Sequence, residues 1–175
     1  MLNNTMNAKS HSLVNLAATL ALGAAVLGAT SLMPVVAADK KEENKVSKDL
    51  AKPLKAAQDA LQAKKYPDAL AKLKEAESNP KKTPYDEHVI NVLAGSAYAR
   101  TNDFPDAEKA FEAQANDGFT EASELPRIVK AVAQINYQLK NYDKAIEYGN
   151  RAIKNGAGDD EINVIVGQSY YLKGD

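Results

Sequence analysis

One histidine and one serine have the residue types and spacing that could support nucleophilic catalysis. His88 stands beside Asp86 and Glu87 near the expected start of a helix, and Ser96 follows eight residues later. A catalytic triad needs its serine, histidine and carboxylate within hydrogen-bonding distance of one another. On a single helix, a spacing of eight residues corresponds to about 12 Å. We therefore predict that His88 is a solvated residue at a helix start, without a catalytic or metal-binding role.

Clusters of carboxylates suggest a second possible chemistry, the binding of a metal ion. They occur at Asp68, at Asp86 with Glu87, at Glu121 with Glu124, and at residues 159–161. Each cluster falls where a helix is expected to begin, and acidic side chains there interact favourably with the helix dipole. The 159–161 cluster also lacks the alternating oxygen ligands and the glycine of a calcium loop. We interpret these groups as helix-start residues that hold no metal.

The remaining composition excludes several further kinds of site. The absence of cysteine excludes disulfides, thiolate zinc sites and cysteine nucleophiles. Gly156 and Gly158 stand alone, so the chain has no glycine-rich phosphate loop or dinucleotide fingerprint. The 22 basic and 23 acidic residues nearly balance, whereas nucleic-acid-binding proteins show a basic excess. The sequence therefore predicts no catalytic residue, no cofactor, no metal and no nucleic-acid partner.

The first 38 residues differ in composition from the rest of the chain. They contain one charged side chain, Lys9, and an apolar run over residues 13–33, whereas residues 39–43 are densely charged. A weakly basic start, an apolar run and small residues before the junction are typical of a secretory signal peptide. The pattern predicts a cleaved signal peptide over residues 1–38 and hence a periplasmic or secreted bacterial protein.

The sequence leaves open the exact cleavage position and whether the segment is cleaved at all. Val36 and Ala38 at the −3 and −1 positions favour cleavage before Asp39, and cleavage after Ala37 fits nearly as well. The apolar run also approaches the roughly 20 residues that a membrane span needs, so an uncleaved anchor is the alternative. It would be the chain's one contact with a membrane. Residues 39–49, of mixed charge, are expected to form a solvated linker.

A short motif, an aromatic residue three positions before an alanine, recurs at a fixed spacing at residues 65–69, 103–107 and 141–145 of the remaining chain. Its alanines, Ala69, Ala107 and Ala145, are 38 residues apart. Recurrence at such a period is the signature of a stacked-repeat architecture. Runs with helical periodicity precede each motif (residues 53–64, 87–100 and 126–140) and follow it (67–77, 105–115 and 143–154). Because no window alternates with period two, the sequence predicts an all-α array of helix hairpins.

These residues resemble the tetratricopeptide repeat (TPR) family. That family places a small pair in the first helix, an aromatic residue near the turn and a small residue at the opening of the second helix. The matching residues are Ala56, Ala57, Tyr66, Ala69, Leu73 and Ala76, then Ala94, Gly95, Tyr98, Phe104, Ala107 and Phe111, then Val132, Ala133, Tyr142, Ala145 and Ala152, and finally Val166, Gly167, Tyr170 and Tyr171. The resemblance covers residues 50–175, about three and a half repeats. It implies a right-handed superhelical array of antiparallel helix hairpins, a TPR-like α-solenoid.

The resemblance carries expectations for the core. Ala69, Ala107 and Ala145 should be fully buried, with Tyr98 and Phe111 filling the space between helices. The 38-residue period exceeds the usual 34 of the family, so the first two loops between repeats should be long. Gly149 stands where the family has a bulky residue, which predicts a thinly packed spot that Tyr148 partly fills.

The family's binding mode implies a candidate site. In a TPR array the first helices line a concave groove, and amide side chains there suit a peptide backbone. The candidate groove residues are Gln58, Leu61, Ser96, Arg100, Lys130, Gln134, Tyr137, Gln168 and Tyr171. The alternative is that they are ordinary residues of a solvated face. The sequence favours an exported scaffold that binds a protein or peptide in this groove, without catalysis of its own.

Two other functions stay open. The chain stops at Asp175, where the second helix of a fourth repeat would begin, and leaves Val164, Val166, Tyr170 and Leu172 on a last helix. Either the sequence is an N-terminal fragment of a longer protein, which we favour, or this helix pairs with another chain. The array would then be the docking module of a larger exported enzyme or a self-associating structural module.

Overall fold

A computed structural model describes residues 44–174, so the predicted signal peptide and residues 39–43 of the predicted linker lie outside the described residues. Within this range the chain is helical and has no strand. The helices are α2 (Lys48–Gln62), α3 (Tyr66–Glu77), α4 (Pro84–Thr101), α5 (Phe104–Asn116), α6 (Leu125–Gln138), α7 (Tyr142–Ala152) and α8 (Asp160–Lys173), and a short π-helical segment (Ile153–Ala157) extends α7. The predicted all-α fold is confirmed.

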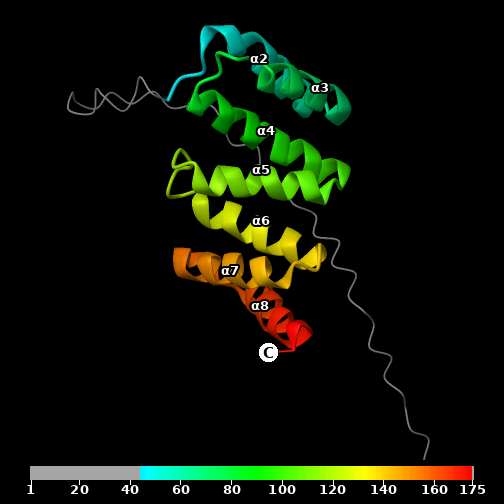
Figure 1. Cartoon of the computed structure of the whole chain (residues 1–175), viewed down its shortest axis with the longest axis vertical. Helices are drawn as coiled ribbons and strands as arrows, with labels where there is room; N and C mark the ends of the chain where they lie inside the picture. The colour runs from blue at the N-terminus through cyan, green and yellow to red at the C-terminus, as the bar shows by residue number, and fades with distance from the viewer. Residues whose placement is uncertain (1–43, 175) are drawn as a thin grey trace, which may run out of the picture.

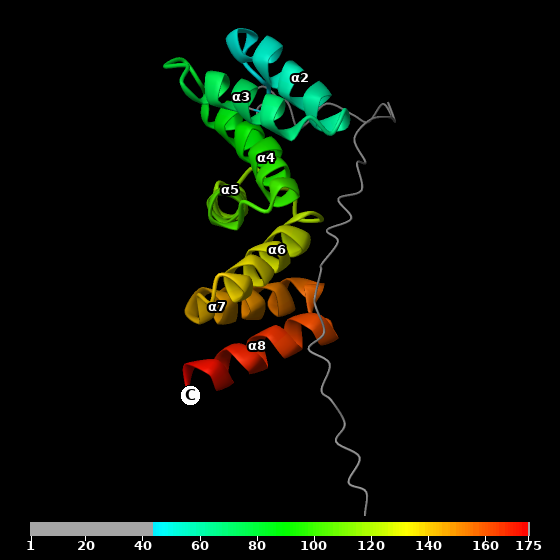
Figure 2. The same cartoon turned by 90° about the vertical axis from the view of Figure 1, so that its right-hand side faces the viewer.

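Consecutive helices form hairpins that stack along one axis (Figure 1). Helix α2 pairs with α3, α4 with α5 and α6 with α7, while α8 stands as the first helix of a fourth unit. The turned view of Figure 2 shows the same succession, with α2 near one end and α8 at the other. The second helix of each hairpin also packs against the first helix of the next, so neighbouring repeats share their cores, as in a solenoid.

The 38-residue period is also present in the backbone conformation. Lys64, Asn102 and Lys140 each end the first helix of a hairpin in the left-handed conformation, with φ of 58°, 60° and 59°. The N–H of the next residue donates to the carbonyl five positions earlier, at Ala60, Tyr98 and Asn136, over 2.8, 3.0 and 2.8 Å. This bond closes a Schellman motif. All three hairpins therefore turn in the same way, which makes each repeat a structural copy of the last.

Helix starts confirm the interpretation of two acidic clusters and also hold prolines. Pro67 and Pro105 lie in the first turns of α3 and α5, where a missing N–H breaks no helical bond. Asp86 forms a capping box with Thr83 at the start of α4. Asp159 caps α8, because its Oδ1 accepts a hydrogen bond from the Ile162 N–H over 3.0 Å.

The first helix begins earlier than the sequence predicted. Helix α2 starts at Lys48, and Pro53, the expected start, lies inside it. The reason is the burial of Leu50, which is fully buried and joins Leu54 in a core cluster with residues of α4. The last two residues of the predicted charged linker, Lys48 and Asp49, therefore belong to the first repeat.

The predicted core alanines are confirmed. Ala69, Ala107 and Ala145 are all 0 % exposed, so helix backbones approach closely at these positions. Phe111 is 2 % exposed within the larger of two core clusters, which spans α5 to α8. Tyr98 is partly buried and packs against both clusters. It thereby links the core of the first two repeats to that of the later ones.

The expectation of a thin spot at Gly149 is wrong. Gly149 is buried, and a Cβ atom built on it would overlap the side chain of Val166. Helix α8 therefore lies against the bare backbone of α7 at this point. The glycine replaces the usual bulky residue because Val166, from the next helix, occupies the space that such a residue would take.

Candidate functional site

The nine candidate groove residues lie on the first helices of the four units. Six of them are half-buried (Gln58, Leu61, Ser96, Lys130, Gln134 and Tyr137) and three are exposed (Arg100, Gln168 and Tyr171). Helix α2 packs against α4, and α6 packs against α8. The candidates therefore form two groups, one on α2 and α4 and one on α6 and α8.

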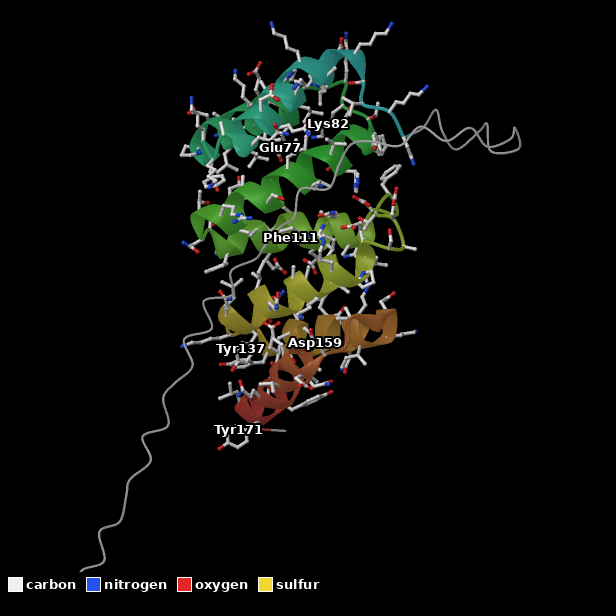
Figure 3. All side chains as sticks on the ribbon, turned by 180° about the vertical axis from the view of Figure 1, so that it is seen from behind. Glu77, Lys82, Phe111, Tyr137, Asp159 and Tyr171 are labelled. Carbon is white, nitrogen blue, oxygen red and sulfur yellow. The ribbon has the colours of Figure 1, made fainter. Side chains whose placement is uncertain are left out.

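Side chains of the second group bond to one another across α6 and α8. Lys130 Nζ lies 2.5 Å from Asp159 Oδ2 and 2.9 Å from Glu161 Oε2. Gln134 Nε2 donates to Glu161 Oε1 over 2.8 Å, and the Tyr137 hydroxyl donates to Gln168 Oε1. Figure 3 shows Tyr137 and Asp159 near the crossing of these helices, with Tyr171 at the far end of α8.

The charges of this α6–α8 contact stabilise each other. Partial burial opposes the charged form of Lys130, but hydrogen bonds to Asp159 and Glu161 outweigh it and raise the pKa of the lysine. The hydrogen bond from Lys130, with one from the Ile162 N–H, lowers the pKa of Asp159. Lys130, Gln134, Tyr137 and Gln168 thus join two repeats. Their polar groups already have partners within the chain.

The first group, on α2 and α4, has free polar groups. Within residues 44–174 the side chains of Gln58 and Arg100 make no hydrogen bond or ion pair. Ser96 Oγ donates to the Val92 carbonyl of its own helix over 3.1 Å, which leaves its lone pairs open. Leu61 adds a half-buried apolar surface. This part of the predicted groove can still bond to a partner.

A hollow that the sequence reasoning missed lies between α3 and α5, with α4 as its floor. Its volume is about 600 Å³. Its apolar lining consists of Leu70, Ala71, Leu73, Ile90, Ala94, Tyr98, Ala110 and Ala113, and its polar lining of Lys74, Glu77, Glu87, Asn91, Asp106 and Lys109. Because Ala94 and Tyr98 are each two residues from Ser96, about 200° around the helix, the hollow faces away from the Ser96 side. The many alanines of α3 and α5 are the feature of the sequence that could have predicted this hollow, because small side chains leave space between the second helices of neighbouring hairpins.

His88 is not the solvated residue that the sequence predicted. Its side chain is 12 % exposed, and Nδ1 lies 2.8 Å from Asp117 Oδ2. The imidazole forms a three-ring cluster with Tyr85 and Phe119, in which the ring centroids lie 5.6–5.7 Å from one another. Asp117 Oδ1 in turn accepts the Phe119 N–H over 2.9 Å. His88 thus holds the loop between α5 and α6 against the start of α4, a structural role that depends on a partner 29 residues away.

No three His, Asp or Glu side chains among residues 44–174 are grouped so that they could hold a metal ion. None of the helices between these limits is long and apolar enough to cross a membrane.

The stacked hairpins, their common turn and the polar faces of their first helices define the class of helical-repeat proteins. The sequence model of the tetratricopeptide repeat family matches residues 54–119 and again 92–160. The chain belongs to this family, whose repeats generally serve as non-catalytic scaffolds for protein binding. No curated protein and no solved structure matches it.

Proposed function

We propose that the protein is an exported scaffold that binds a protein or peptide on the first helices of its first two repeats. Membership of the TPR family supports the scaffold role, and the composition of residues 1–38 supports export to the periplasm or beyond. The scaffold has no catalysis of its own. Its partner contacts Gln58, Leu61, Ser96 and Arg100.

One observation supports placing the binding site on α2 and α4. Gln58 and Arg100 have no partner within residues 44–174, whereas Gln134 and Gln168, at the places on α6 and α8 equivalent to that of Gln58, are bonded to neighbouring helices. A glutamine can both donate to and accept from the backbone of an extended peptide. The guanidinium of Arg100 adds a permanent positive charge and five donors. Binding therefore concentrates on α2 and α4.

Site-specific photo-crosslinking tests this placement. A photo-reactive phenylalanine derivative is placed at Gln58 or Arg100, and in a control protein at Glu147, an exposed residue of the second helix α7. We expect one discrete crosslinked partner in the envelope fraction from the first two positions and none from Glu147. With the purified partner, Arg100→Ala should weaken binding by tenfold or more, since arginine contacts often dominate interfaces. Equal crosslinking from all three positions would contradict the site.

The apolar surface of α8 favours a second candidate function, self-association. Val164, Tyr171 and Leu172 are 53 %, 81 % and 49 % exposed. Two such helices could bury these side chains against each other. Sedimentation over a range of protein concentrations tests this, with Leu172→Glu as the variant that should abolish any dimer. A wild-type chain that stays monomeric throughout would eliminate this candidate.

A further inference from the structure

The near-neutral charge of the whole chain conceals two oppositely charged parts. Residues 44–83, which hold the first hairpin and the loop that follows it, contain ten lysines and five carboxylates, a net charge of +5. Residues 84–174 contain nine basic and fourteen acidic residues, a net charge of −5. The charge balance of the whole chain, which argues against a nucleic-acid partner, therefore does not describe the first repeat.

The excess positive charge is concentrated on the outer side of α2. Lys48, Lys52 and Lys55 are exposed and spaced four and three residues apart, so they lie on one side of the helix. The core side chains of α2, Leu50, Leu54 and Ala57, lie on the opposite side. We call these three lysines the lysine face. Figure 3 shows nitrogen-tipped side chains projecting from this end of the array.

The lysine face is mostly unneutralised and lies at the end of the stack. Lys55 pairs with Asp59 over 2.7 Å, whereas Lys48 and Lys52 have no ion pair within residues 44–174. Exposed lysines also flank the helix, Lys45 before it and Lys64 and Lys65 after it. Because α2 is the first helix of the described array, no further repeat among these residues covers its outer side.

We propose that the lysine face binds the surface of a membrane that contains anionic lipids. All ten cations of residues 44–83 are lysines. Nucleic-acid and phosphopeptide recognition instead favour the bidentate guanidinium of arginine and, for single strands, stacking aromatic rings. A row of lysines on the outside of one helix, without a groove, suits a flat, diffusely charged surface. Each lysine near such a surface contributes attraction that salt screens.

The position of the apolar run in the sequence supports a membrane as the partner of the lysine face. Fourteen residues separate Met33, the last residue of the run, from Lys48. A chain of that length spans at most about 50 Å. While residues 13–33 occupy a membrane, during export or as an anchor, α2 is thus held near lipid headgroups. Membrane binding by the lysine face does not depend on partner binding to the groove residues of α2 and α4.

Vesicle co-sedimentation tests the proposal. Wild-type protein and variants are purified by the same route, and intact mass confirms that they share one N-terminus. Vesicles of phosphatidylglycerol and phosphatidylcholine in equal parts are compared with vesicles of phosphatidylcholine alone. We expect stronger binding to the anionic vesicles, lost as salt is raised. The double variant Lys48→Gln/Lys52→Gln should bind them roughly 30-fold more weakly.

Matched variants separate a lysine face from total charge. Lys140→Gln/Lys154→Gln removes the same charge from exposed residues of the third repeat and should bind as the wild type does. Lys48→Arg/Lys52→Arg keeps the charge and should also bind. Circular dichroism confirms that each variant is helical. Equal binding to both kinds of vesicle, or an equal loss in the third-repeat variant, would overturn the proposal. Tighter lysine-dependent binding to duplex DNA in the same buffer would overturn the choice of partner.

Discussion

Lys144 on α7 lies 2.8 Å from Glu108 on α5, and its Nζ also lies 2.7 Å from Glu112 one turn further along. Glu108 is nearly buried and accepts a second hydrogen bond, over 3.3 Å, from Asn136 of α6. Glu112 also accepts one from the Tyr148 hydroxyl over 3.0 Å. One ammonium group therefore joins the second helices of two neighbouring repeats. At the next junction Lys130 of α6 pairs with Asp159 and Glu161 at the start of α8, and so joins the first helices of the third and fourth units.

Replacing Lys144 should destabilise the junction between the second and third repeats. Lys144→Met leaves the buried Glu108 carboxylate without its main partner, and an unsatisfied buried polar group costs about 1–3 kcal/mol. We expect urea denaturation to show a loss of this size. Lys154→Met, at an exposed position without an ion pair, is the matched control and should leave the midpoint unchanged. A loss no larger than that of the control would show that the ion pairs do not hold the junction.

Gly149→Ala should weaken the docking of α8. The added methyl group overlaps the Val166 side chain, and overpacking of this kind typically costs about 1–3 kcal/mol. Gly167 has open space around it on α8, so Gly167→Ala is the control and should be neutral or stabilising. The double variant Gly149→Ala/Val166→Ala should recover part of the loss, because it removes the clashing methyl groups. Thermal unfolding of the wild type and the three variants measures these changes in stability. If the double variant is no more stable than Gly149→Ala, the clash with Val166 is not the cause of the loss.

Lys64→Asn and Lys140→Asn should each stabilise the protein. Both lysines hold the left-handed conformation that asparagine holds at the equivalent position Asn102. That conformation costs most residues about 1–2 kcal/mol, and asparagine tolerates it better. We expect gains of a few tenths to about 1 kcal/mol in chemical denaturation, and a loss of similar size for the reverse change, Asn102→Lys. Gains without the reverse loss would mean that charge, not backbone conformation, is responsible.

Stability should fall in acid. Burial alone would raise the pKa of Asp86 and Glu112, but several hydrogen bonds together outweigh it and hold both pKa values below the ordinary 3.8 and 4.5. The bonds come from Thr83 and Ser47 to Asp86, and from Lys144 and Tyr148 to Glu112. A carboxyl whose folded pKa is lowered stabilises the fold above its unfolded pKa, and this contribution disappears as pH falls through the folded value.

The free energy of unfolding should therefore be level above about pH 5 and decrease below it. Urea denaturation at a series of pH values measures the profile. Glu112→Gln removes one titrating group and should flatten the acid limb while lowering stability at neutral pH. An acid limb of unchanged steepness in Glu112→Gln would show that this carboxyl does not contribute to it.

Much of the fold could be predicted because its determinants are local. The 38-residue spacing of Ala69, Ala107 and Ala145 reflects a hairpin that the chain forms three times, and small residues are needed wherever two backbones approach closely. Family resemblance then provided the identity of the first helices and hence a candidate groove. The start of α2 was misplaced because Pro53 is a common first residue of a helix, whereas the burial of Leu50 depends on α4.

For the candidate site, too, some features follow from the sequence and others depend on the tertiary structure. The sequence by itself determined which residues stand on the first helices, since helical periodicity and repeat register follow from the order of residues. Only the tertiary structure decided that Gln134 and Tyr137 bond to α8 while Gln58 and Arg100 do not. It likewise decided that His88 contacts Asp117, that Val166 covers Gly149, and that a hollow opens between α3 and α5. Each of these relationships depends on the angle and distance between separate helices, which the packing of all the repeats sets together.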